Sequence, residues 1–129
     1  MTVDRNQIIA EELSKREPFV WGARDCCLWS ASVVERVTGK DFAQVYRGTY
    51  STQHGALRAI QKAGGLVELI SSVLGDPIQP IKAARGDPVL GFAPDPSAGI
   101  CVGHRAAFIR QDGTFLMLDL DRCTAAWSV

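Results

Sequence analysis

The chain has 129 residues, 47% of them hydrophobic, and its fourteen basic residues balance fourteen acidic ones. This length predicts one domain over residues 1–129 with an ordinary hydrophobic core. Zero net charge leaves no basic field for nonspecific nucleic-acid binding, so we expect no nucleic-acid partner. No apolar run approaches the ~18 to 20 residues that cross a membrane, and no signal peptide is visible. We therefore expect a protein made in the cytoplasm and without a membrane span.

Helical periodicity marks the N-terminal half. Asp4 is placed to cap a first helix, which Pro18 ends, and Asp25 is placed to cap a second, which ends at Gly39. The predicted helices cover a segment from Asp4 to before Pro18, Cys26–Thr38, a segment that starts at Ser51 or Thr52 and ends at Gly64-Gly65, and residues 66–74.

Short apolar runs separated by prolines follow, and they are typical of strands. These runs cover residues 89–92, 99–102, 105–110, 114–120 and 125–129, with a hairpin turn at residues 111–113. Residues 93–98 are predicted to form a surface loop. The predicted fold class is therefore α+β, with N-terminal helices packed on a C-terminal antiparallel sheet.

The four cysteines, at positions 26, 27, 101 and 123, do not have the spacing of a metal site. A cytosolic chain rarely keeps structural disulfides, and two adjacent cysteines do not easily pair with each other. Because no Cys-x-x-Cys is present, a structural zinc site is not expected, and we expect no metal and no cofactor. A redox or iron–sulfur protein that uses all four thiols remains a third hypothesis.

Cys26 is the candidate nucleophile. It follows the predicted cap Asp25, so its thiol would lie in the first turn of a helix. The positive end of the helix dipole would lower the pKa of this thiol and raise its thiolate fraction. The alternative is a small core residue, since cysteine is among the most buried residue types.

A cysteine nucleophile needs a base, and the chain has two histidines. His104 lies at the entry to the strand over residues 105–110, where it can face the start of a helix packed on the sheet. His54 lies near the start of the third helix and is predicted to be solvated. Asp119, on the next strand, is the candidate for the third polar group that would orient the imidazole, and Asp121 competes with it.

Three segments resemble the NlpC/P60 cysteine peptidases. Phe-Val-Trp-Gly at residues 19–22, followed by Asp25-Cys26, resembles that family's Tyr-x-Trp-Gly…Asp-Cys-Ser-Gly segment. Gly-Asp-Pro-Val-Leu at residues 86–90 is similar to its Gly-Asp-Leu-Val-Phe strand. His-Arg-Ala-Ala-Phe-Ile at residues 104–109, followed by Asp112-Gly113, resembles its His-Val-Gly-Ile-Tyr-Ile-Gly-x-Gly strand.

A closer resemblance is to small NlpC/P60-like proteins encoded in phage and prophage tail gene clusters, and it rests on Tyr50, Gly64-Gly65 and residues 126–129. It implies a papain-like NlpC/P60 architecture with Cys26 as nucleophile, His104 as general base and Asp119 in the third polar position. The implied reaction is hydrolysis of an amide bond in peptidoglycan stem peptides through an acyl-enzyme. The implied location is the virion tail, with tail-tip or tail-hub proteins as partners.

Three departures from the family pattern favour a second hypothesis, a non-catalytic structural component of a tail tip or tail assembly. Phe19 replaces the usual tyrosine, Cys27-Leu28 replaces Ser-Gly, and Arg105-Ala106 replaces Val-Gly. Retention of both Cys26 and His104 favours the enzyme. For either function we expect a docking surface that includes an exposed Trp127 and Val129.

Overall fold

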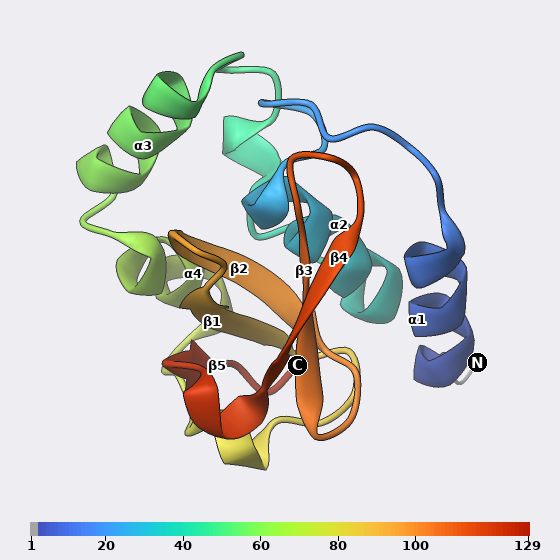
Figure 1. The fold of residues 1–129 in the computed structure, drawn as a ribbon. Helices are drawn as coiled ribbons and strands as arrows, with labels where there is room; N and C mark the ends of the chain where they lie inside the picture. Colours follow the sequence, from blue (N-terminus) through green and yellow to red (C-terminus); the bar gives the residue numbers. More distant parts are fainter. Residues whose placement is uncertain (1–2) are drawn as a thin grey trace.

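The structure, a computed structural model, describes residues 3–129 (Figure 1). Four helices precede a five-stranded antiparallel sheet, which confirms the predicted α+β class and the order of its halves. The helices are α1 (Arg5–Ser14), α2 (Cys26–Thr38), α3 (Gln53–Lys62) and α4 (Leu66–Leu74). The strands are β1 (Pro88–Phe92), β2 (Pro96–Cys101), β3 (Arg105–Ile109), β4 (Phe115–Asp119) and β5 (Ala125–Ala126).

Helix α2 is the element on which the sheet packs, mainly through β2. It begins and ends where the sequence predicts, because Asp25 accepts a hydrogen bond from the Leu28 N–H and Gly39 takes the left-handed conformation with φ of 81°. The buried side chains of α2 meet those of the sheet face that it covers. This interface forms the main core and holds the first turn of α2 close to the start of β2.

The strand order is β4-β3-β2-β1-β5, so β2 lies at the centre of the sheet. Strand β2 begins at Pro96, and the predicted surface loop over residues 93–98 is therefore wrong at its C-terminal end. Ser97 and Ala98 are buried and pair with Gly91 and Leu90 of β1. Pro96 can stand in a sheet because it is the first residue of the strand, where the missing N–H interrupts no ladder.

Trp127 belongs to the core, with 0% of its surface exposed. Its Nε1 donates hydrogen bonds to the Gly75 carbonyl at 3.0 Å and to Ser71 Oγ at 3.2 Å, so it fastens α4 to the sheet. Val129 is half-buried, and its N–H donates to the buried carboxylate of Asp87. The predicted docking surface at Trp127 and Val129 is wrong, because a fully buried indole cannot meet a partner.

Within residues 3–129, no helix has the length and apolar character needed to cross a membrane. Over the same residues, no three histidine, cysteine, aspartate or glutamate side chains come together in a way that could hold a metal ion. The four thiols therefore do not converge as the iron–sulfur hypothesis requires.

We predict that Trp127→Ala lowers the free energy of unfolding by about 3–5 kcal/mol, because it leaves a cavity in the core and removes both hydrogen bonds to the α4 end. Urea denaturation monitored by circular dichroism measures this loss. The control is Val45→Ala, whose side chain is 75% exposed and whose replacement should change stability by less than about 0.5 kcal/mol. A loss below about 1 kcal/mol for Trp127→Ala would contradict the core position of the indole.

Candidate functional site: the cleft at the start of helix α2

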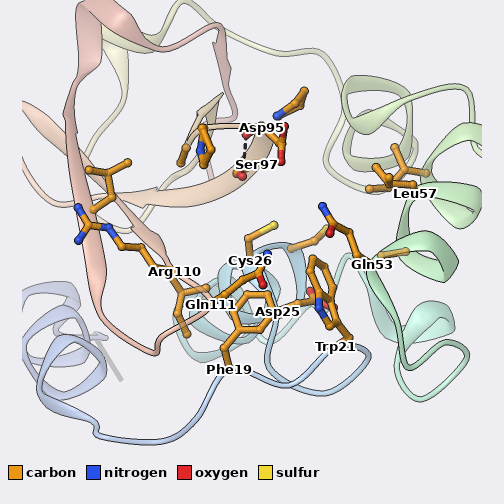
Figure 2. Close-up of a pocket in the computed structure, with 18 of the residues that line it drawn as sticks. Phe19, Trp21, Asp25, Cys26, Gln53, Leu57, Asp95, Ser97, Arg110 and Gln111 are labelled. Atoms are coloured by element: carbon orange, nitrogen blue, oxygen red, sulfur yellow. Dashed lines mark hydrogen bonds between the residues drawn. The ribbon is translucent and has the colours of Figure 1, made fainter.

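A cleft with a cavity volume of about 400 Å³ opens beside the first turn of α2 (Figure 2). Its walls come from the loop before α2, from α3, and from the two hairpin loops at one end of the sheet. Most of its lining is apolar, which is typical of a binding site. The labelled side chains in Figure 2 are Phe19, Trp21, Asp25, Cys26, Gln53, Leu57, Asp95, Ser97, Arg110 and Gln111.

Asp25 lies at the floor of this cleft and joins the segments around it by hydrogen bonds. Only 1% of its surface is exposed, yet its carboxylate has no cationic partner among residues 3–129 within hydrogen-bonding distance. Its Oδ1 accepts the Leu28 N–H at 3.0 Å, while its Oδ2 accepts the Gly22 N–H at 3.0 Å and the Tyr50 hydroxyl at 2.6 Å. Three neutral donors thus replace the water that the buried carboxylate loses.

Gly22 is required at its position for two reasons. Its φ of +83° lies in the left-handed region, which residues with a Cβ rarely adopt. A Cβ added there would also lie 1.8 Å from the carbonyl oxygen of Tyr50. The loop and the segment that carries Tyr50 can therefore approach closely only around a glycine, and this contact brings the Tyr50 hydroxyl to Asp25.

Tyr50 remains a protonated donor to Asp25 over the accessible pH range. Burial of the phenol raises its pKa far above the usual value, and the adjacent Asp25 carboxylate raises it further. The interaction therefore persists as a neutral hydroxyl donating to a carboxylate.

Cys26 places its sulfur in the cleft, directed toward the start of β2 (Figure 2). Burial raises the pKa of this thiol, and the charge of Asp25 adds to the rise. The backbone of Ala98 and the side chain of Ser97 beside the sulfur offset part of this rise in pKa. The predicted lowering of the pKa by the helix dipole is wrong, because the cost of burying a thiolate exceeds the benefit of the helix N-terminus.

Ser97 is the polar side chain that β2 brings to Cys26. Its hydroxyl donates to the Asp95 carbonyl at 2.9 Å, so its single proton is already committed. A serine hydroxyl is also far too weakly basic to accept a proton from a thiol. Cys26 therefore lies beside a neighbour that cannot generate its thiolate.

The structure does not bring the predicted catalytic residues together. His104 is exposed in the turn before β3, and β3 runs from that turn toward the cleft, so His104 lies at the opposite end of this strand from the cleft (Figure 1). Five strand residues span roughly 17 Å at ~3.3 Å each, which is far beyond the reach of a hydrogen bond. The proposed pair of Cys26 and His104 is therefore not assembled.

Asp119 also lies at this distant end. It pairs across the strands with Arg105, whose Nε donates to Asp119 Oδ1 at 3.0 Å, and both side chains are exposed. Asp121 follows it in the short turn after β4 and does not line the cleft. His54 is exposed on α3 and does not line the cleft either.

Neither Ser97 nor Tyr50 is predicted as a site residue from the sequence. Tyr50 contributes to the prediction only through the resemblance, because a tyrosine in the segment Arg-Gly-Thr-Tyr gives no chemical signal of its own. Ser97 fell inside the predicted loop, and only the start of β2 at Pro96 places it in the sheet. The apolar run after Ser97 predicts a strand, and its earlier start at Pro96 was detectable because proline is tolerated at the first residue of a strand.

A family described as a domain of unknown function (DUF6950) matches residues 4–129, and the chain belongs to this family. The match covers nearly all of the chain, including the cleft and every strand. No curated protein matches the chain at a significant level.

We predict that Asp25→Ala lowers the free energy of unfolding by about 2–4 kcal/mol, because it removes the α2 cap and leaves the buried Gly22 N–H and Tyr50 hydroxyl without an acceptor. The matched control is Asp4→Ala. Asp4 also caps a helix, accepting the Gln7 N–H at 3.0 Å, but it is exposed and should cost about 1 kcal/mol or less. Denaturant unfolding of both variants measures the difference, and equal losses would show that Asp25 is only a cap.

Proposed function

We propose that this protein has an NlpC/P60-like fold of papain-like architecture in which the hydrolytic centre is not formed, and that it serves as a non-catalytic component of a phage tail tip or tail assembly. The observation that carries the proposal is the position of Ser97 beside the Cys26 thiol. The placement of a cysteine in the first turn of a helix that packs on an antiparallel sheet supports the resemblance at the level of architecture.

The strand motif of the peptidases also fits this chain in a second register, seven residues earlier. Ser-Ala-Gly-Ile-Cys-Val-Gly at residues 97–103 follows the pattern His-Val-Gly-Ile-Tyr-Ile-Gly, with serine at the position of histidine. Gly99 then occupies the position of the motif's first glycine. A Cβ at Gly99 would lie 2.3 Å from the Ala107 carbonyl oxygen and 2.7 Å from the Phe108 ring, so this position requires glycine.

In this register the general base is missing, so the first step of a cysteine peptidase, removal of the proton from the thiol, has no group to perform it. Attack on an amide needs a thiolate, and in this class of enzyme an imidazole beside the cysteine accepts the thiol proton. Ser97 cannot do so, and His104 with Asp119 lies at the other end of β3. The hydrolysis of peptidoglycan stem peptides is accordingly the weaker of the two hypotheses.

The assignment to a phage tail rests on the closer resemblance, which is carried by Tyr50, Gly64-Gly65 and residues 126–129. Two of these residues have a structural role in the fold. The Tyr50 hydroxyl donates to Asp25, and Trp127 joins α4 to the sheet. Zero net charge suits close association with other proteins, since little self-repulsion opposes it. The proposed partners are tail-tip or tail-hub proteins, and the proposed location is the virion tail.

We predict that iodoacetamide modifies Cys26 slowly at pH 7, because a thiol with a raised pKa is protonated there and becomes reactive only as the pH rises above the ordinary thiol range. His104→Ala should leave the rate unchanged. Ser97→His, which places an imidazole next to the sulfur, should raise the rate at pH 7 by about tenfold or more. Mass spectrometry of the peptides measures each cysteine separately.

Two controls define this experiment. Ser97→Asn has a similar added volume without a titratable ring, so it isolates the effect of the base. Cys123 is an internal reference, because burial raises the pKa of its thiol to about 11. Rapid modification of wild-type Cys26 at neutral pH that is lost in His104→Ala would contradict the proposal and restore the peptidase hypothesis.

We further predict that a Cys26→Ser gene supports tail assembly as well as the wild-type gene does, because the thiol performs no chemistry. Complementation of a phage or prophage that lacks the gene, scored by the titre of infectious particles, measures this. Asp25→Ala is the matched destabilised variant and should reduce the titre. A Cys26→Ser titre as low as that of a deletion would show that the thiol acts chemically.

A further inference from the structure

Helix α3 presents an uncovered apolar side to the cleft. Leu57 is 48% exposed although its side chain lines the cavity, and Ile60 one turn later is half-buried. On the facing wall, Phe19 and Trp21 stack edge to face with ring centroids 4.8 Å apart. A cavity of about 400 Å³ between these walls is large enough for one big side chain of a partner and part of its backbone.

The mouth of the same cavity carries charged and amide groups that have no hydrogen-bond or ion-pair partner within the described part of the chain. Asp95 and Arg110 line it from different hairpin loops, and neither side chain forms an ion pair or hydrogen bond with any residue between 3 and 129. The side-chain amides of Gln53 and Gln111 also have no hydrogen-bond partner within that range. By contrast, Arg47 in the pocket on the other side of α2 is held by Asp41 at 2.6 Å.

This combination fits one kind of ligand. An apolar slot lies between a carboxylate and a guanidinium, neither of which forms an ion pair with a residue between 3 and 129. It complements a chain segment with an apolar residue between opposite charges. Free amide groups at the rim can both donate to and accept from a peptide backbone. A purely apolar ligand would leave these polar groups unused, and a nucleic acid would be repelled by Asp95 and Asp112 at the rim.

We propose that the cleft binds a segment of a partner protein, which inserts one large apolar side chain between Leu57 and the Phe19–Trp21 pair, with a basic residue at Asp95 and an acidic residue at Arg110. This inference rests on the proposed function, because a binding cleft must leave its bound segment uncut. The groups that would contact the segment are on the rim and walls, and Cys26 with Ser97 forms the floor.

The test is selection from a library of random twelve-residue peptides displayed on yeast, with the intact labelled protein as bait. The expected result is enrichment of peptides that share an aromatic or large aliphatic residue with a basic neighbour. Leu57→Asp should weaken the selected peptides by about tenfold or more, and Asp95→Asn by about threefold to tenfold. Fluorescence polarisation with the synthetic peptides measures both changes.

Val73→Asp is the matched control, because Val73 is 46% exposed on α4 and lies outside the cleft. It should leave the affinity unchanged, and circular dichroism checks that all variants fold. The inference would be overturned if the wild-type bait enriched no peptide more strongly than the Leu57→Asp bait does. It would also be overturned if the selected peptides bound Leu57→Asp as tightly as the wild type. Concentration-dependent self-association that Leu57→Asp abolishes would also overturn it, since a second copy would then be the occupant.

The two proposals fail separately. If Cys26 is unreactive and the library yields no binding peptide, the binding inference is refuted and the non-catalytic assignment stands. A Cys26 that is rapidly alkylated at neutral pH removes the non-catalytic assignment, whatever the library yields.

Discussion

The buried carboxylate of Asp25 is the constraint on which the cleft depends. Taking a carboxylate out of water is costly, and here three neutral donors from three different segments satisfy it. Each donor fixes something: the Leu28 N–H fixes where α2 begins, the Gly22 N–H fixes the loop before it, and the Tyr50 hydroxyl fixes the segment before α3. Because these segments form the floor and one wall, Asp25 fixes that part of the cleft, and the two hairpin loops of the sheet form the rest.

The same arrangement decides the chemistry of Cys26. A helix N-terminus favours a thiolate, typically by 0.3–1 kcal/mol for exposed groups, whereas burial away from water shifts thiol pKa values by larger amounts. Asp25 directly before the cysteine adds a negative charge that opposes a second one. The residue that caps the helix so well therefore also disfavours the thiolate. A base beside the sulfur would be needed to reverse this balance, and β2 supplies Ser97.

Local signals predicted much of this fold from the sequence. The caps Asp25 and Gly39 gave both ends of α2, and alternation gave the β3–β4 hairpin within a residue or two. The start of β2 was missed because Pro94 and Pro96 suggest a loop, although a proline is tolerated at the first position of a strand. That error hid Ser97 and left His104 as the apparent partner of Cys26. Which end of β3 faces the cleft depends on the sheet topology, and residue types alone cannot reveal it.

The most direct test of the account is an NMR titration of Cys26 in the folded protein labelled with ¹³C at the cysteine β-carbon. The account predicts that the Cys26 signal keeps the chemical shift of a thiol through pH 8, and that its midpoint lies above the ordinary thiol value of about 8.5. A midpoint below pH 7, accompanied by a change in the titration of His104, would show that a thiolate–imidazole pair forms and would contradict the account.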